Sequence, residues 1–330
     1  MDNAEQRHEE TLMNKKIIAV VGATGEQGGG LVRAILANPH GEFTVRALTR
    51  KPNSELGRKL AKLGAEVVAA DVNDPKSMLA AFSGAYGAFC VTNFWEQSTP
   101  EKEVKQARTM ALAARDAGVQ HTIWSTQEDT RRLIPLEDSR MPTLKGRYKV
   151  PQFDAKGESD RHFTDLQVPT TFLLTPFSWE NLFLFGMGEK RDPHGKLTFV
   201  LPMEDKKLPG MAMEDIGECI HGIFKRGTGM AGRTVGLASE HLTGEQIAAT
   251  LKQVTGQDVD YSSMPPEVYR TFNFPGASDL ANMFQFMRDF EQQYCAARDP
   301  VLSRELNPKL QTLAEWISRN KGRHARGAHD

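Results

Sequence analysis

The sequence predicts an α/β protein built on a doubly wound parallel sheet, with a smaller and irregular α/β region on the C-terminal side. Two observations predict this fold. Short apolar runs rich in β-branched residues alternate with segments of helical periodicity through the first half, as in strands buried between covering helices. Beyond Pro176 the composition shifts toward Met, Pro, Gly and Phe. Strands and helices that alternate at this spacing imply right-handed crossovers and parallel strands.

The elements of the predicted sheet follow in chain order. The first strand is expected at 16–21 (KIIAVV), and the first helix runs through 31–38 (LVRAILAN) after a glycine cluster. Further strands are expected at 43–48, 66–70, 86–91, 121–125 and 170–174, with helices at 54–63, 75–82, 99–117 and 153–163. The longest helix has the clearest ends, because Thr99 suits the N-cap, Pro100 the first helical position and Gly118 the residue past the end.

The regular alternation ends after the fifth strand. Residues 126–152 combine prolines and many charges with little periodicity, which predicts a surface excursion beside the carboxyl edge of the sheet. Later elements are expected as a strand at 233–239 and helices at 244–254 and 310–320. We therefore divide the chain into a disordered N-terminus at 1–14, a first domain at 15–175, a covering region at 176–320 that returns some segments to the sheet, and a frayed tail at 321–330.

Composition excludes several classes of function. Lys and Arg number 41 against 42 Asp and Glu, so the formal net charge of −1 argues against a nucleic-acid-binding protein. No apolar run approaches the roughly 20 residues that a membrane-spanning helix needs, and the polar first residues do not resemble a secretory signal. Cys90, Cys219 and Cys295 lie far apart and predict neither a disulfide framework nor a metal site. We expect a soluble cytoplasmic protein without a structural metal.

A glycine-rich loop carries the strongest chemical signal. Gly22, Gly25 and Gly28 follow the first predicted strand with GxxGxxG spacing and open the first helix. The first glycine permits a tight turn, the second lets backbone approach a pyrophosphate, and the third allows close helix–strand packing. The phosphates would lie against amide groups at the positive end of the helix. The domain at 15–175 is therefore expected to be an NAD(P)-binding Rossmann domain.

The end of the second strand indicates which dinucleotide is bound. Proteins that prefer NAD place an acidic residue there to bind the ribose hydroxyls. This sequence has Thr49, Arg50 and Lys51 instead, and the next carboxylate along the chain after them is Glu55. Two cations suit a 2′-phosphate, and an arginine can also stack on adenine. We expect NADP(H) to bind more tightly than NAD(H); the alternative is a solvated pair of surface cations.

Several segments together resemble the NmrA-like family of atypical short-chain dehydrogenases, and most closely its animal-type NADPH redox sensors. The resemblance extends over nearly the whole chain after Asn14 and includes both predicted regions. Its segments are GATGEQGG (22–29), VTNFWE (91–96), EVKQAR (103–108), FDAKGE (153–158), ENL (180–182) and FPGASDLANMFQF (274–286).

The resemblance implies a set of cofactor contacts along the carboxyl ends of the strands, where ligands bind in such sheets. These contacts are Gly22, Thr24, Gly25, Glu26, Gln27 and Gly28 at the pyrophosphate, Arg50 at the 2′-phosphate, Asp71 and Val72 beside the adenine, Thr92, Asn93 and Phe94 toward the nicotinamide ribose, Lys156 at the ribose hydroxyls, and Pro176, Trp179 and Asn181 at the nicotinamide.

The usual catalytic set of these enzymes is incomplete. A typical member uses Ser, Tyr and Lys, with the Tyr four residues before the Lys on one helix face. Ser125 ends the fifth predicted strand, and Lys156 opens the following helix, so both match. The residue four before Lys156 is Gln152, which cannot act as an acid, and Tyr148 has the wrong spacing. Asp154 is interpreted as a cap at an exposed helix start.

Two hypotheses follow from the missing tyrosine. In the first, the protein reduces a quinone or another aromatic acceptor, with Lys156 as the main electrostatic residue and Ser125 as a weaker substrate contact. In the second, it binds NADP(H) without turnover and reports the redox ratio to a regulatory protein partner, with 126–152 as the mobile element. Proteins of both kinds occur in the family. A homodimer is left open.

The aromatic residues of the second half also have two interpretations. Phe172, Phe177, Trp179, Phe183 and Phe185 either roof an aromatic substrate or form ordinary core. The segment 274–286 either closes the same pocket or packs as a helix, and Trp95 is a candidate wall.

Overall fold

The structure, a computed structural model, describes residues 15–96, 99–184, 190–191 and 197–320. The expectations for 1–14, 321–330 and Phe185 lie outside these residues, as does the side chain of Phe183.

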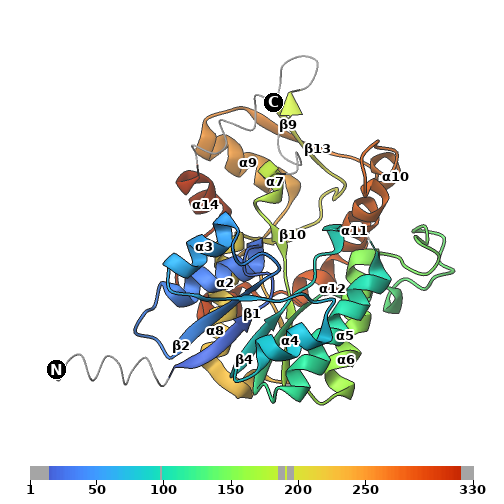
Figure 1. The fold of residues 1–330 in the computed structure, drawn as a ribbon. Helices are drawn as coiled ribbons and strands as arrows, with labels where there is room; N and C mark the ends of the chain where they lie inside the picture. Colours follow the sequence, from blue (N-terminus) through green and yellow to red (C-terminus); the bar gives the residue numbers. More distant parts are fainter. Residues whose placement is uncertain (1–14, 97–98, 185–189, 192–196, 321–330) are drawn as a thin grey trace, which may run out of the picture.

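A seven-stranded sheet forms the centre of the first domain, in the order β11-β6-β5-β4-β1-β2-β3, and its strand pairs are all parallel. The chain builds outward from β1 through β2 to β3, then crosses back to β4 on the other side of β1 (Figure 1). This reversal creates a switch point between β1 and β4, where ligands of such sheets bind. The strands are β1 (Lys16–Val20), β2 (Phe43–Thr49), β3 (Glu66–Ala69), β4 (Gly87–Cys90), β5 (His121–Thr126), β6 (Thr170–Leu174) and β11 (Thr234–Gly236).

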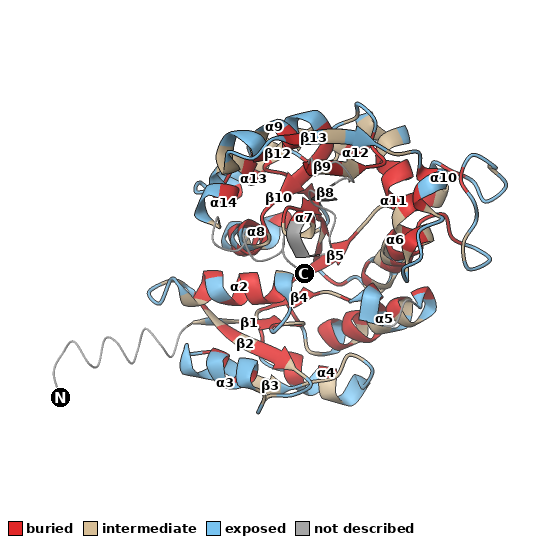
Figure 2. Cartoon of the chain, turned by 90° about the horizontal axis from the view of Figure 1, so that it is seen from above, coloured by how far each residue is buried: buried red, intermediate tan, exposed pale blue. Residues whose placement is uncertain are grey.

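Helices cover both faces of this sheet, as the predicted crossovers require. Alternate residues of β1 point to opposite faces, so Ile18 and Val20 join one apolar cluster and Ala19 joins the other. The sheet is accordingly buried between helices whose outer faces are exposed (Figure 2). The helices are α2 (Glu26–Leu36), α3 (Glu55–Lys62), α4 (Pro75–Phe82), α5 (Pro100–Asp116), α6 (Pro151–Asp165) and α8 (Met213–Arg226). The predicted doubly wound Rossmann fold is confirmed.

The first helix begins earlier than its apolar periodicity predicts. It starts at Glu26 rather than Leu31, and therefore includes the consecutive glycines 28–30. Glycine weakens a helix interior, so this run gives little helical signal in the sequence. Close backbone contacts explain two of these glycines: a Cβ on Gly28 would lie 2.4 Å from the Gly22 carbonyl oxygen, and Gly30 faces Gly217 of α8, where an added Cβ would lie 2.2 Å from the Gly30 carbonyl carbon. The two helices thus cross with their backbones almost in contact.

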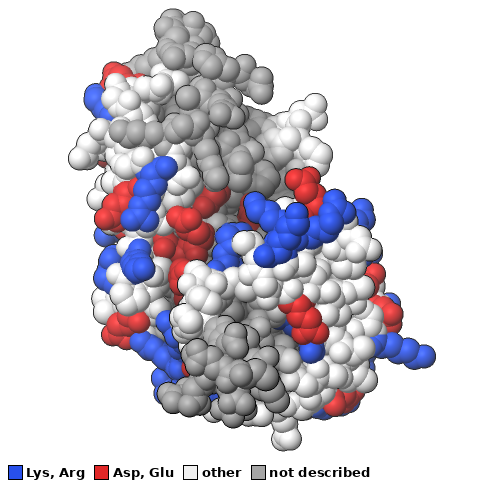
Figure 3. All heavy atoms as spheres, turned by 60° about the vertical axis from the view of Figure 1, so that its left-hand side comes forward, with Lys and Arg blue, Asp and Glu red and all other residues white. Residues whose placement is uncertain are grey.

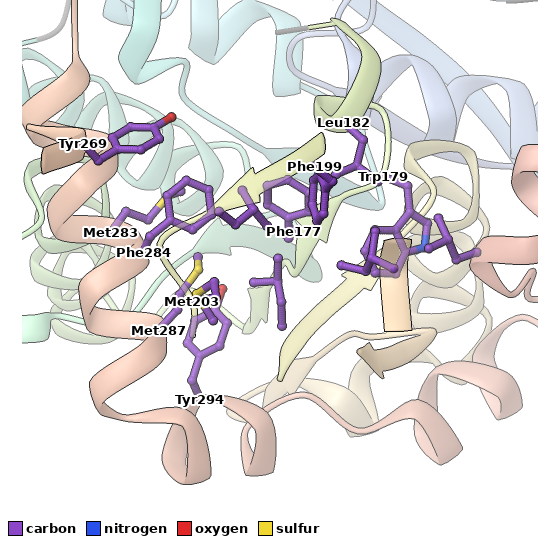
Figure 4. Packing of buried hydrophobic residues seen from close by; sticks show 14 of the residues in the cluster. Phe177, Trp179, Leu182, Phe199, Met203, Tyr269, Met283, Phe284, Met287 and Tyr294 are labelled. Carbon is purple, nitrogen blue, oxygen red and sulfur yellow. The ribbon is translucent and has the colours of Figure 1, made fainter. Parts of the chain in front are cut away.

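The covering region contains two small three-stranded sheets and several helices, of which β9, β13, α9 and α10 lie above the first domain in Figure 1. One sheet has the order β12-β10-β7 and the other β13-β9-β8. Their shared apolar core includes Phe177, Phe199, Phe284 and Tyr294 (Figure 4). The remaining elements are β7 (Phe177–Ser178), α7 (Asn181–Leu184), β8 (Lys190–Arg191), β9 (Leu197–Leu201), β10 (Leu208–Met211), β12 (Glu240–Leu242), α9 (Gly244–Thr255), β13 (Val259–Ser263), α10 (Pro266–Tyr269), α11 (Ala277–Asp289), α12 (Glu291–Ala296), α13 (Pro300–Leu306) and α14 (Leu313–Arg319).

The excursion between β5 and α6 is anchored by Asp154, which is fully buried. Its carboxylate accepts hydrogen bonds from the amide and hydroxyl of Thr130 at 2.8 and 2.6 Å, and from the amides of Lys149 and Val150 at 2.8 and 3.1 Å. Burial raises the pKa of Asp154, and these bonds oppose the rise. The expectation of an exposed cap was wrong, because the excursion folds back over the start of α6.

Candidate cofactor and substrate site

The glycine loop connects β1 to α2 in the conformation that its sequence predicts. Gly22 has a φ of +66°, and the Gly25 amide donates to the Gly22 carbonyl at 2.8 Å. A Cβ on Gly28 would lie 2.4 Å from that same carbonyl oxygen. The first amides of α2 lack intrahelical acceptors, and Thr24 and Glu26 beside them are exposed. The loop is a preformed cradle for an anion at a helix N-terminus.

Gln27 ties this loop to the middle of the sheet. The hydroxyl of Ser125, at the end of β5, donates to the Gln27 side-chain oxygen at 2.8 Å. Ser125 is 1% exposed. Its hydroxyl hydrogen is already used by Gln27, so contact with a substrate requires an exchange of partners.

The predicted 2′-phosphate cations lie at the end of β2, at the surface. A guanidinium nitrogen of Arg50 is 2.7 Å from a carboxylate oxygen of Glu96, and both side chains are about half exposed. Lys51 is exposed as well. An exposed ion pair typically contributes only about 0–1 kcal/mol to the stability of a protein. Arg50 can therefore exchange Glu96 for a phosphate at a small cost in free energy.

The predicted adenine loop after β3 is shaped by Asp71. Its carboxylate accepts hydrogen bonds from the Asn73 amide at 2.9 Å and side-chain nitrogen at 2.8 Å, as in an Asx-turn. Val72 packs partly buried against the apolar cluster on this side of the sheet. Both residues thus lie at the carboxyl edge, where the prediction requires them.

Lys156 is held in place by four neighbouring residues. Its ammonium group donates to the Thr92 hydroxyl at 2.9 Å, and to the carbonyl oxygens of Thr92 and Ser125 at 3.3 Å each. A carboxylate oxygen of Glu103 lies 3.3 Å away. The Trp124 ring centroid is 5.2 Å from the same nitrogen. The structure therefore brings Lys156, Thr92 and Ser125 together at the carboxyl ends of β4 and β5.

Two carboxylates near Lys156 were missed by the sequence reasoning. Glu103 on α5 is 3% exposed and accepts the Thr92 hydroxyl at 2.5 Å. Asp160, one helical turn beyond Lys156, accepts the Trp124 indole N–H at 2.9 Å and the Thr126 hydroxyl at 2.6 Å. Burial raises the pKa of Asp160 to about 7. Glu103 lies within the segment EVKQAR of the resemblance, but an acid in a first helical turn gives no sign of burial.

The structure places no phenol at the position that usually supplies the acid. Gln152 is buried, and its side-chain nitrogen donates to the Asp279 carbonyl at 3.2 Å. The Tyr148 hydroxyl instead donates to the Glu101 carboxylate at 3.0 Å. Neither residue can protonate a substrate beside Lys156.

Comparison with known proteins now decides the family. A model of the NmrA-like family matches residues 14–317. The chain belongs to the NmrA-like family. The NmrA-like family domain-containing oxidoreductase FrzB of a Cladobotryum species is 34% identical over 293 residues, which cover 85% of this chain and 86% of FrzB. The predicted family is thereby confirmed.

Solved structures agree with this assignment at the level of the fold. The complex of NmrA, a negative transcriptional regulator, with NADP has a TM-score of 0.76 at 22% identity, and covers 96% of this chain and 99% of NmrA. NmrA has also been solved with NAD. The NADPH complex of the quinone oxidoreductase QOR2 from Escherichia coli has a TM-score of 0.69 at 22% identity, and covers 92% of this chain and 99% of QOR2.

The NmrA-like protein closes the carboxyl edge of β5 and β6 with a buried arginine from the covering region. Arg298 is fully buried and makes two bonds to the Glu128 carboxylate, at 2.6 and 3.0 Å. It also donates to the Gln127 side chain at 2.7 Å and to the Thr175 carbonyl at 3.2 Å. Its guanidinium carbon lies 3.6 Å from the Tyr294 ring centroid. Arg298 thus joins the two regions of the NmrA-like protein through one buried network.

The predicted nicotinamide residues follow β6 into the covering region. Pro176 and Trp179 are buried, and Asn181 begins α7 half-buried. Trp179 belongs to the apolar core in Figure 4, and a Cβ on Gly210 would lie 1.9 Å from its ring. These contacts favour the core interpretation of Trp179 over a roof, and its contact with a cofactor stays a prediction.

The segment 274–286 is divided between helix packing and an exposed edge. Phe284 and Phe286 on α11 are buried, and the Phe284 ring centroid lies 6.2 Å from that of Phe177. Phe274 stays 39% exposed. Trp95 is half exposed and lies on Gly276, where an added Cβ would come within 2.8 Å of its ring. Trp95 therefore connects the β4 loop to the covering region.

The other features of the described residues concern metal sites, membrane-spanning helices, cysteines and surface charge. Within the described ranges, no group of three or more His, Cys, Asp or Glu side chains could hold a metal ion. The same part of the chain contains no helix that is both long and apolar enough to cross a bilayer. Burial raises the pKa of the Cys90 thiol, which agrees with an inert side chain. The face in Figure 3 carries basic and acidic side chains interspersed.

Proposed function

We propose that this NmrA-like protein is an NADP(H)-dependent oxidoreductase that reduces a quinone or a similar conjugated aromatic compound. The observation that carries this proposal is a partly buried ammonium group, Lys156, held beside a preformed anion cradle with no phenol at position 152. The fit to a dinucleotide rests on this chain's own geometry, because the glycine at position 28 lets α2 begin directly against the Gly22 carbonyl, where a Cβ would clash at 2.4 Å.

In this proposal the protein binds and orients, and supplies little acid chemistry. NADPH, when bound, supplies the hydride. The reduced acceptor carries negative charge spread over its conjugated ring and oxygen, and water can provide the proton. Lys156 stabilises that charge electrostatically, while Thr92 and Ser125 fix the position of its nitrogen. A substrate that needs a strong protein acid does not fit this arrangement.

The relatives support the class of reaction. FrzB is named an oxidoreductase of the NmrA-like family, and so is hkm9 of Aspergillus hancockii. QOR2, which shares the fold, is named a quinone oxidoreductase. We propose further that residues 176–320 act as the substrate-covering region, with Ser125 as a minor substrate contact.

The preference for NADP(H) is proposed from the surface cations. Arg50→Ala is expected to weaken NADPH binding about fivefold, because an exposed phosphate–guanidinium contact contributes on the order of 1 kcal/mol. NADH binding is expected to change little, since NADH lacks the 2′-phosphate. Dissociation constants of NADPH and NADH, measured by fluorescence titration, check both expectations. Lys62→Ala on exposed α3 is the matched control, and equal wild-type affinities for NADPH and NADH would refute the preference.

The alternative function is an NADP(H) sensor that regulates a protein partner. The absence of a phenol at position 152 favours it, because a protein that never transfers hydride needs no acid there. The similarity of the fold to NmrA, a negative transcriptional regulator, points the same way.

One assay separates the two functions. NADPH absorbance is followed with purified protein, with and without a panel of quinones and polycyclic aromatic ketones. Acceptor-dependent consumption supports the reductase. Tight NADPH binding without consumption across the panel rejects the reductase in favour of the sensor.

A further inference from the structure

A second charged group, the Glu103 carboxylate, lies 3.3 Å from the Lys156 ammonium group. We propose that Glu103 is a positioning residue, which balances the charge of Lys156 and holds its ammonium group toward the carboxyl edge of the sheet. This inference rests on the proposed function of Lys156, and it adds a residue to which neither the family assignment nor the names of the relatives gives a role.

The burial of Glu103 is not explained by the helix end alone. An acid in the first turn of a helix is stabilised by the helix dipole, but this stabilisation does not require the acid to be buried. Glu101 lies in the same turn of α5 and is exposed. Glu103 is 3% exposed, on the face of α5 that packs against α6. A buried carboxylate is costly unless a cation balances it, and Lys156 is that cation.

The hydrogen-bond directions form one ordered chain. The Lys156 ammonium group can only donate, and it donates to the Thr92 hydroxyl at 2.9 Å. That hydroxyl has one hydrogen, which it donates to Glu103 at 2.5 Å. The carboxylate therefore fixes the orientation of the Thr92 hydroxyl, and the hydroxyl presents its lone pair to Lys156. Glu103 acts on Lys156 both directly, at 3.3 Å, and through Thr92.

Only one oxygen of Glu103 is used in this network. Its Oε2 atom is buried and has no hydrogen-bond partner among the described residues. Within the described part of the chain, the contacts of the Glu103 carboxylate are those with Thr92 and Lys156.

The other acid near Lys156 is a poorer counterion. Asp160 lies on α6, and its Oδ1 atom is occupied by the Trp124 indole and the Thr126 hydroxyl. Because burial raises the pKa of Asp160 to about 7, much of it is uncharged at neutral pH. Arg132 and Lys156 both lower the pKa of Asp160, so its charge is shared between two cations. Glu103 is therefore the principal counterion of Lys156 before any cofactor binds.

Glu103→Gln tests this role, because it keeps the shape and an oxygen acceptor for Thr92 but removes the charge. The variant is expected to lower turnover about tenfold at neutral pH and to move the alkaline fall of the pH–rate profile to lower pH. NADPH affinity at neutral pH should change less than about threefold, since Glu103 faces Lys156 rather than the phosphates. Glu101→Gln, in the same helical turn, should leave the rate and profile unchanged. A pH–rate profile of Glu103→Gln that is identical to that of the wild-type protein would overturn the proposal.

A double-mutant cycle with Lys156→Met separates positioning from a general structural effect. If Glu103 acts through Lys156, Glu103→Gln has no further effect on turnover once Lys156 is replaced. The double variant, which removes both charges, should also regain the unfolding temperature that either single variant loses. Additive losses of rate, or an unfolding temperature that falls further, would overturn the inference.

The inference can fail separately from the proposed function. If the wild-type protein consumes no NADPH with any acceptor, the reductase proposal fails. NADPH affinity measured against pH then tests Glu103, because the affinity of Glu103→Gln should fall at lower pH than that of wild type. Identical pH dependence of binding would reject Glu103 as the positioning residue.

Discussion

Lys156→Met is expected to lower acceptor-dependent NADPH consumption about 100-fold, as electrostatic groups aimed at developing charge typically contribute this much. Methionine keeps the apolar stem against the Trp124 ring, 5.2 Å from the lysine nitrogen, so mainly the charge is lost. NADPH affinity should weaken less than about tenfold, because the phosphates bind at the glycine loop instead. Steady-state rates with titrated acceptor, together with fluorescence titration of NADPH, measure both quantities.

The control for this variant is Lys105→Ala, which removes an exposed lysine from α5. Thermal unfolding of each variant is needed as well, because Lys156→Met leaves Glu103 buried without its cation. A folded Lys156→Met protein with an unchanged rate would remove Lys156 from the mechanism. A rate lost only in proportion to NADPH affinity would reassign Lys156 to cofactor binding.

Gly28→Ala is expected to weaken NADPH binding at least about 100-fold, because its Cβ would lie 2.4 Å from the Gly22 carbonyl oxygen and 2.7 Å from the Val21 oxygen. Both neighbours are backbone atoms, so the loop itself must move and the amides of the cradle no longer converge. Isothermal titration of NADPH, with circular dichroism to verify the fold, measures the effect.

Gly229→Ala supplies the matched control, since an added Cβ there meets no atom within 4 Å. It should bind NADPH as the wild type does. If folded Gly28→Ala protein retained wild-type affinity, the glycine loop would not be the cofactor cradle, and the anion site would have to be sought elsewhere.

Local sequence signals predicted the sheet well, because each depends on residues close together in the chain. The apolar run at 16–21 became β1, and the proline and glycine around 99–118 located α5 within one or two residues. The glycine spacing predicted the turn at Gly22, since a positive φ is a local backbone demand. The start of α2 was the exception, because Gly28 packs against the Gly22 carbonyl and Gly30 against α8, and neither contact depends on helix propensity.

The environment of the site depends on residues that are distant in the sequence. Arg298 reaches Glu128 across 170 positions of the chain, and no local pattern predicts that pairing. Asp154 resembled a cap until the excursion folded over it. The sequence allows Trp179 to be either a cofactor contact or core, and only its packing against Gly210 favours the core.

The sequence by itself determined the parallel sheet, the phosphate loop, the cations after β2 and the lack of a tyrosine at position 152, because periodicity, spacing and residue type are properties of short segments. Only the tertiary structure decided which charges are buried together. Helix α5 presents both Glu101 and Glu103 from one turn, and its packing on α6 leaves the first in solvent and brings the second to Lys156. The cost of burying a charge depends on its neighbours in space, so the counterion of Lys156 could be identified only in the folded chain.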